Sequence, residues 1–215
     1  MMEFIKQPMA IEHRSMELIA PYLAGLSLSE AEKKVYSRII HAAGDVEYAP
    51  IIRISETAVA AGIAALRGGA DIYTDVEMVR TGINKRKLAS FGGTVHCRIA
   101  DPEIAARAKT QGVTRSLMAM RSFGAALTGS VIAIGNAPTA LLEVIRLIRE
   151  EGVKPALIVG MPVGFVSAAE SKDLLMTVDN VPWITIKGRK GGSTLVVAAI
   201  HALLGIAEAE QKKVA

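Results

Sequence analysis

The chain has 215 residues, of which 51% are hydrophobic, 21% are charged and 4% are aromatic. This composition excludes an intrinsically disordered chain, which has few apolar residues and a high net charge. A single cysteine excludes a disulfide scaffold, and four scattered histidines provide no cluster for a structural metal. The formal net charge of +4 is too small for a nucleic-acid-binding surface, although it suits an anionic small molecule.

No segment predicts a membrane span or a secretory signal. The most apolar stretch, residues 195–206, is interrupted by His201 and is far shorter than the ~20 residues that cross a bilayer. Charged residues occur throughout the N-terminal segment, whereas a signal peptide has an apolar centre. We therefore expect a cytoplasmic protein whose cysteine stays reduced.

Residues 1–69 are predicted to be mainly helical. The first helix has apolar residues at helical spacing and stops at Pro21. Ser29 and Glu32 form a capping box that opens the second helix, and Gly44 favours its C-terminal stop. The predicted helices span residues 11–20, 29–43 and 55–67.

Residues 70–206 alternate between short β-branched runs and helical patterns. Runs such as 131–134 are apolar throughout, as expected of strands that are covered on both faces. Five alternations predict an α/β fold, in which a three-layer, mostly parallel five-stranded sheet is flanked by helices and follows the N-terminal helical segment. We expect residues 1–215 to form one domain, with a polar helical tail over 207–215 that frays. The strand–helix pairs are 71–74 with 75–81, 94–99 with 102–110, 130–134 with 138–151, 156–159 with 168–175, and 183–186 with 193–204.

Three of the predicted strand-to-helix loops are rich in Gly and Pro. Such loops follow the carboxyl ends of parallel strands, where ligands bind in sheets of this kind. Glycine lets a backbone approach a ligand, and helix N-termini offer N–H groups to anions. None of the loops has a dinucleotide or P-loop fingerprint, and ordinary turn chemistry is the alternative for each. The loops are residues 135–138, 160–165 and 188–193, and the last adds Arg189 and Lys190 as potential receivers of a carboxylate or phosphate.

The end of the second helix carries a candidate acid–base group. Arg38 and His41 are three residues apart and therefore share a helix face. Asp45 follows the helix and could orient the imidazole, which titrates near neutral pH. A histidine in a last helical turn can also serve only as a cap, so the residues alone leave both interpretations open.

Arginines next to hydroxyl side chains recur along the chain. A guanidinium fork binds a carboxylate through two hydrogen bonds, and a neighbouring hydroxyl can add another. A solvated surface position is the alternative for each pair, but together the pairs favour a ligand with several carboxylates. The pairs are Arg14 with Ser15, Arg80 with Thr81, Arg115 with Thr114 and Ser116, and Arg121 with Ser122.

The other histidines and the cysteine indicate no further site. His201 lies in an apolar helical pattern and is expected to be a satisfied core histidine. His13 is expected at an exposed position, and His96 in a strand. Cys97 is expected to be a buried, inert thiol.

Six stretches occur in the order RIIHAAGD (38–45), TDVEMVRTGI (74–83), TRSLMAM (114–120), IGNAPTAL (134–141), MPVGFVSAAESK (161–172) and GRKGGSTL (188–195). Together they resemble the precorrin-8X methylmutase family, also called cobalt-precorrin-8 methylmutase. The resemblance runs from about residue 5 to residue 206. His201 stands where we would expect Asn, outside these motifs.

The resemblance implies an isomerase of cobalamin biosynthesis. The family moves a methyl group from carbon 11 to carbon 12 of a corrinoid ring, giving hydrogenobyrinate, or cobyrinate when cobalt is present. It implies an α/β homodimer with active sites at the subunit interface, no external cofactor and no metal ligands from the protein. The family's proton donor or acceptor maps to His41, and its substrate-contacting serine and arginine map to Ser15 and Arg38.

The implied chemistry needs few protein groups. The shift is intramolecular, so a single positioned acid that protonates the ring could supply ~10²–10⁴-fold of the acceleration. A carboxylate near His41 would favour the charged imidazolium. Arg14, Thr81 and Arg115 are expected to help bind the acetate and propionate arms of the substrate. The alternatives are a non-catalytic corrinoid carrier, which would not need His41, and an unrelated nucleotide-binding enzyme.

Overall fold

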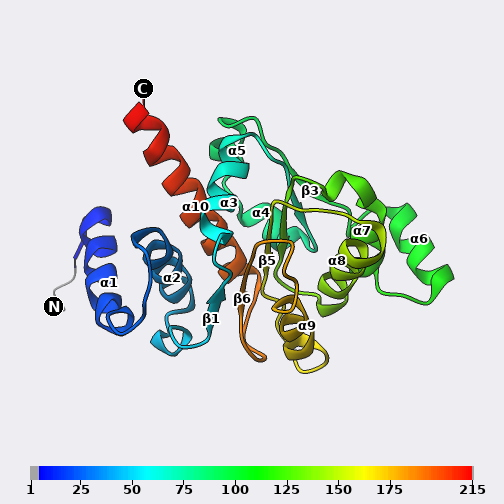
Figure 1. The fold of residues 1–215 in the computed structure, drawn as a ribbon, viewed down its shortest axis with the longest axis horizontal. Coiled ribbons are helices and arrows are strands. Elements are labelled where there is room, and N and C mark those ends of the chain that lie inside the picture. Colours follow the sequence, from blue (N-terminus) through cyan, green and yellow to red (C-terminus); the bar gives the residue numbers. More distant parts are fainter. Residues whose placement is uncertain (1–4, 215) are drawn as a thin grey trace.

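The computed structural model describes residues 5–214, which form a six-stranded sheet between two layers of helices (Figure 1). The strand order is β1-β6-β5-β4-β2-β3. Strand β1 pairs antiparallel with β6, and all other neighbours are parallel. The strands are β1 (Ile52–Ile54), β2 (Ile72–Thr74), β3 (Val95–Cys97), β4 (Val131–Ile134), β5 (Leu157–Gly160) and β6 (Trp183–Ile186).

The central strands are buried on both faces, which explains their uniformly apolar sequences. Side chains alternate across a strand, so β4 contributes to two cores. Val131 and Ala133 pack into the core on one side of the sheet, and Ile132 and Ile134 pack into the core on the other side. The predicted α/β class is therefore confirmed.

The first core lies under α2, α3, α4, α5 and α10, and the second under α7, α8 and α9, with α6 packed outside α7 (Figure 1). The helices are α1 (Pro8–Leu23), α2 (Glu30–Ala43), α3 (Ala58–Arg67), α4 (Glu77–Gly82), α5 (Lys85–Ala89), α6 (Pro102–Gln111), α7 (Arg115–Phe123), α8 (Pro138–Glu151), α9 (Ala168–Leu175) and α10 (Ser193–Val214), with short 3₁₀ turns η1 (Val46–Tyr48) and η2 (Gly124–Leu127).

Helix α2 has the termini that its sequence predicts. The Ser29 side chain accepts a hydrogen bond from the Glu32 backbone, and the Glu32 carboxylate accepts one from the Ser29 backbone. Gly44 ends the helix with a φ of 63°, a conformation that glycine adopts without the steric cost of a Cβ. Because both ends are fixed, the last turn of α2 has a defined position relative to the sheet.

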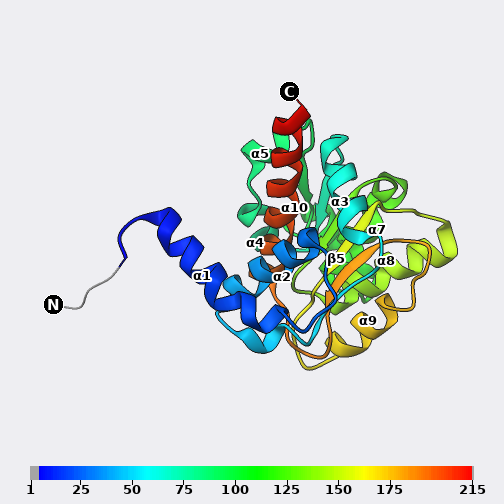
Figure 2. The same cartoon turned by 60° about the vertical axis from the view of Figure 1, so that its left-hand side comes forward.

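The expected end of the first helix at Pro21 is wrong. Helix α1 contains Pro21 and continues to Leu23. A proline removes one backbone donor, and here it lies only two residues before the helix ends, so little of the hydrogen-bond ladder is lost. Helix α1 packs against α2 and projects from the body of the molecule (Figure 2).

The structure also contains elements that were not predicted. Strand β1 is a sixth strand within the segment expected to be helical, and helices α5 and α7 add to the second half. Helix α10 continues through the predicted tail, where Glu208 pairs with Lys87 at 2.6 Å and Glu210 pairs with Arg67 at 3.1 Å.

Helix α10 is long and apolar enough to cross a membrane by length and composition alone. In this fold 56% of its most apolar window is buried, and it packs against α2, α3 and α4. Its apolar residues therefore serve the first core.

Candidate functional site

The loops at the carboxyl edge of the parallel strands are joined by a buried carboxylate. Asp75, directly after β2, is fully buried. Its carboxylate accepts hydrogen bonds from the backbone N–H groups of Gly135, Asn136 and Ala137 at 3.0, 2.9 and 2.7 Å. Burial raises the pKa of the Asp75 carboxyl, and the three N–H groups oppose that shift. Asp75 thereby fixes the loop between β4 and α8.

The other two glycine-rich loops are hydrogen-bonded to each other. Gly192 N–H donates to the Met161 carbonyl at 2.9 Å. A Cβ at Gly191 would lie 2.4 Å from the same oxygen, so only glycine fits there. The buried Lys172 of α9 donates from Nζ to the Lys190 carbonyl at 2.6 Å, and burial lowers the pKa of Lys172 to about 8.

Lys190 connects these loops to the segment that follows α2. Its Nζ donates to Asp45 at 3.0 Å and to Glu47 at 3.3 Å. The expectation that Asp45 orients His41 is therefore wrong. The Asp45 carboxylate instead accepts from Lys190 and from the Glu47 backbone, and these bonds hold the pKa of Asp45 below its usual value.

His41 lies in the last turn of α2 with its side chain exposed. Among residues 5–214, no group makes a hydrogen bond or ion pair with its imidazole. The side chain lines a cavity of about 220 Å³ together with Arg38, Thr194, Val197 and His201, and with Ala42 and Ala198. An unengaged imidazole on a cavity wall can exchange a proton with a bound molecule.

A larger and mostly apolar cavity lies beside the first one. It has a volume of about 520 Å³ between α4 and the start of α10. Thr81 and Met78 of α4 line it, and Thr194 and Val197 line both cavities. The structure thus places Thr81 on the wall of a cavity that adjoins the one around His41.

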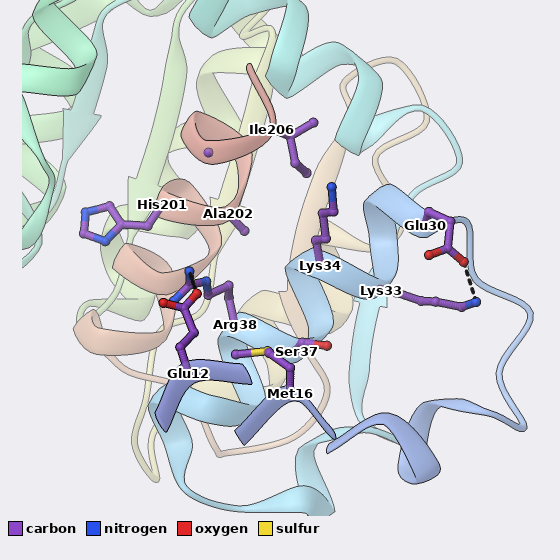
Figure 3. Close-up of a pocket in the computed structure, with 11 residues that line it drawn as sticks. Glu12, Met16, Glu30, Lys33, Lys34, Ser37, Arg38, His201, Ala202 and Ile206 are labelled. Atoms are coloured by element: carbon purple, nitrogen blue, oxygen red, sulfur yellow. Dashed lines mark hydrogen bonds and ion pairs between the residues drawn. The ribbon is translucent and has the colours of Figure 1, made fainter. Parts of the chain in front are cut away.

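A third cavity, of about 400 Å³, lies between α1, α2 and α10 (Figure 3). Arg38 lines this cavity as well as the one at His41. Its Nη2 donates to Glu12 Oε1 at 2.5 Å, so in the isolated chain a carboxylate of α1 already occupies the guanidinium (Figure 3).

Three other predicted substrate-binding residues do not line these cavities. Ser15 Oγ donates to the Ile11 carbonyl at 2.9 Å within α1, and the exposed Arg14 pairs with Glu17 at 3.0 Å. Arg115 begins α7 and is exposed, and within residues 5–214 its guanidinium makes no hydrogen bond or ion pair. One chain therefore brings together Arg38, His41 and Thr81 only.

The arginines of two remaining arginine–hydroxyl pairs form ion pairs within the fold. Arg80 pairs with Glu77 at 2.6 Å. Arg121 pairs with the buried Glu143 at 2.8 Å, which fastens α7 to α8. These guanidinium groups are engaged by the protein's own carboxylates.

Sequence reasoning expected His201 to be a core histidine, but the structure places it on cavity walls. It is only partly buried, and its Nε2 accepts a hydrogen bond from the Asn84 backbone N–H at 3.0 Å. His201 lines the cavity at His41 and the cavity at α1. The signal in the sequence was a titratable residue in the third turn of an otherwise apolar helix.

The described part of the chain, residues 5–214, contains no group of three His, Cys, Asp or Glu side chains that could hold a metal ion. A model of the precorrin-8X methylmutase family matches residues 10–206. The chain belongs to this family. The family membership that the six motifs predicted is thereby confirmed.

Relatives within the methylmutase family match over nearly their whole lengths. A cobalt-precorrin-8 methylmutase from Leptospira interrogans is 44% identical, over 90% of this chain and 91% of that protein. A precorrin-8X methylmutase from Sinorhizobium sp is 41% identical, over 94% of this chain and 96% of that protein. The crystal structure of a precorrin-8X methylmutase from Thermus thermophilus has a TM-score of 0.86 at 43% identity, covering 94% of this chain and 97% of that one.

Proposed function

We propose that this chain is an isomerase of cobalamin biosynthesis, which moves a methyl group from carbon 11 to carbon 12 of precorrin-8X or cobalt-precorrin-8. The product is hydrogenobyrinate, or cobyrinate when cobalt is present. The observation that carries this function is the methylmutase family match over residues 10–206. The relatives bear both substrate names, so the methyl shift is the common chemistry.

His41 is the proposed acid. Its imidazole is exposed on a cavity wall and is not engaged by the protein, so a bound macrocycle can take its proton. Protonating the ring system makes the carbon that receives the methyl group more electron-poor. One positioned acid accelerates the reaction ~10²–10⁴-fold, and holding the ring in a reactive conformation supplies the rest of the acceleration.

The cavities around His41 provide the proposed substrate site. The apolar walls of the larger cavity, at Met78 and Val197, suit a face of the macrocycle, and Thr81 adds a hydroxyl. Arg38, which lines the same cavity as His41, would bind one carboxylate arm. The reaction as proposed needs no external cofactor, because the methyl group moves within one molecule.

Ser15, Arg14 and Arg115 are proposed to bind further arms in a homodimer whose active sites lie at the subunit interface. Helix α1 supports this arrangement, since it projects from the body and exposes large apolar side chains (Figure 2). A second copy packed on α1 would cover those side chains and bring the outlying residues toward a cavity. The apolar residues concerned include Met9 at 76%, Leu18 at 57% and Tyr22 at 55% exposure.

Two coarser features complete the proposal. Residues 1–215 act as one methylmutase domain, with the helical part and the alternating part sharing a core. The enzyme works in the cytoplasm, where the free Cys97 remains reduced.

Turnover of precorrin-8X and cobalt-precorrin-8, followed by the absorbance change, tests the function. The wild type should convert at least one of them. His41→Ala should catalyse the rearrangement about 10²–10⁴-fold more slowly than the wild type. It should still bind hydrogenobyrinate, because the contacts to the carboxylate arms remain. His96→Gln, on the edge strand β3, is the matched histidine control and should keep turnover.

Two results would contradict this proposal. Near-normal turnover by His41→Ala would show that His41 is not the acid. Binding of hydrogenobyrinate by the wild type without turnover of either substrate would instead identify a corrinoid carrier.

A further inference from the structure

Lys172 is a buried cation that the proposed chemistry does not use. Its side chain on α9 is fully buried. Its Nζ donates to the Lys190 carbonyl at 2.6 Å, which is the only hydrogen bond of this ammonium within residues 5–214. Burial lowers the pKa of Lys172 by disfavouring the charged form, and the Asp173 carboxylate is the weaker, opposing influence. A buried group that breaks the rules of a stable core is expected where a site needs it.

The hydrogen bond from Lys172 links the two helical layers at the edge of the sheet. Helix α9 packs on the core on one side of the sheet, whereas α2 and α10 pack on the core on the other side (Figure 1). The loop that accepts the bond, residues 188–193, leads from β6 into α10. Lys172 thus holds the backbone of this loop from the layer opposite α2 and α10.

The side chain of Lys190 connects the same loop to the helix that carries His41. Its Nζ donates to Asp45 at 3.0 Å and to Glu47 at 3.3 Å. Both carboxylates follow directly after Gly44, which ends α2, and His41 lies in the last turn of that helix. The backbone of Lys190 is therefore held by α9, and its side chain holds the segment after α2.

The loop also determines where α10 begins. The Gly192 carbonyl accepts a hydrogen bond from the backbone N–H of Leu195 at 3.1 Å, in the first turn of α10. Thr194 belongs to this turn and lines the cavity of about 220 Å³ together with His41. One loop thus fixes both helices that form the walls of this cavity.

We infer that Lys172 is a positioning residue for the methyl shift, which acts through Lys190 to hold the end of α2, and His41 with it, in place against the start of α10. This inference rests on the proposed function, because it takes His41 as the acid. Lys172 itself lines none of the three cavities described above. A general acid must lie within hydrogen-bond reach of the atom that it protonates, and a misplacement of about 1 Å can cost about 10²-fold in rate.

Two substitutions interrupt this path at different points. Lys172→Met keeps the length of the buried side chain and removes its donor. Lys190→Met keeps the backbone carbonyl that Lys172 holds and removes the ion pairs to Asp45 and Glu47. Leu175→Val is the matched control, because Leu175 is fully buried on the same helix and perturbs its packing without belonging to the path.

The experiment measures kcat on whichever substrate the wild type converts, the Kd of hydrogenobyrinate and the Tm of each variant. Lys172→Met and Lys190→Met should each lower kcat about tenfold and keep Kd within about threefold, since the proposed contacts to the carboxylate arms remain. In the double variant kcat should stay within about twofold of the single variants, because both substitutions interrupt one path. Leu175→Val should lower the Tm and keep the wild-type kcat.

Several results would overturn the inference while leaving the proposed function intact. A wild-type kcat in Lys172→Met is one, and a loss in the double variant equal to the product of the single losses is another, since the two lysines would then act separately. A weaker Kd with an unchanged kcat in Lys190→Met would show instead that this lysine binds the substrate directly. An equal fall of kcat in Leu175→Val would show that turnover follows the packing of α9.

Two further outcomes complete the test. If Lys172→Met fails to fold, Lys190→Met decides the question, because a wild-type kcat there would overturn the inference and a tenfold loss at constant Kd would support it. A wild type that converts neither substrate would overturn the proposed function, and this inference with it.

Discussion

Arg38 and Arg115 carry the same charge in different surroundings. Arg38 is partly buried and paired with Glu12, whereas Arg115 is exposed and makes no ion pair within residues 5–214. Both are proposed to bind carboxylate arms of a corrinoid. A charged hydrogen bond contributes roughly 1.5–3 kcal/mol when it is shielded from water.

We predict that Arg38→Ala and Arg115→Ala each weaken hydrogenobyrinate binding by about one to two powers of ten at low salt. Added salt should weaken wild-type binding, and it should reduce the difference between wild type and variant most at the more exposed position. Titrations at low and high salt check both effects. Arg107→Ala on α6 is the matched control, since Arg107 is exposed and, within residues 5–214, its one ion pair is with Glu103. Unchanged affinity in both variants at low salt would show that these arginines are solvated surface residues that do not bind the ligand.

Helix α9 carries the one lysine of the described chain that is fully buried, Lys172. Its folded pKa of about 8 lies below the ordinary value of 10.5, because burial disfavours the ammonium form. Below pH 8 the lysine is charged in both states, and the folded protein bears the full cost of burying the charge. Between pH 8 and 10.5 the unfolded chain binds a proton that the folded chain does not, so this lysine makes stability rise with pH.

We predict that Lys172→Met removes this rise. The free energy of unfolding of the wild type, relative to the variant, should increase by about 1–3 kcal/mol from pH 7 to 10.5. Urea unfolding at a series of pH values measures it. The exposed Lys154→Met is the control and should follow the wild type. A difference that does not change with pH would contradict the buried-ammonium account.

At the scale of elements, the sequence predicted what local patterns determine. The capping box and the terminal glycine placed α2, and the apolar runs placed the five parallel strands. Strand β1 has only three residues and gains its pairing from β6, more than 125 residues later, so no local pattern marks it. Likewise α7 has a mixed polar sequence, and its position depends on contacts with α6 and α8.

The candidate site also has features that local sequence predicted and features that depend on long-range contacts. Spacing along one helix predicted that Arg38 and His41 share a face, and the structure places them in one cavity. The error at Asp45 has a long-range cause, because its partner Lys190 is 145 residues away in the sequence. The contact between His201 and the Asn84 backbone joins residues that are 117 positions apart, so a helical pattern does not reveal it.

For the whole molecule, the apolar surface of α1 predicts self-association. Sedimentation should give a stable dimer of the 22.8 kDa chain. Introducing charges with Leu18→Glu and Tyr22→Glu should shift the equilibrium to monomer and reduce turnover, because unpaired carboxylates would be buried at the interface. Ala106→Glu, on the exposed side of α6, is the control. A fully active wild-type monomer would contradict both the dimer and the shared active site.

Under the proposed function, the Glu12–Arg38 pair makes the attachment of α1 part of the binding equilibrium. If Arg38 binds a carboxylate arm through the Nη2 that now donates to Glu12, the event is an exchange of one anion for another and yields less than a contact to a vacant donor would. The displaced Glu12 no longer holds α1 to α2 at this point. Coupled equilibria are reciprocal. If docking of α1 on Arg38 weakens substrate binding by a given free energy, substrate binding weakens the docking of α1 by the same free energy. A partner subunit that repositions α1 would therefore set the affinity of the site as well as complete its walls.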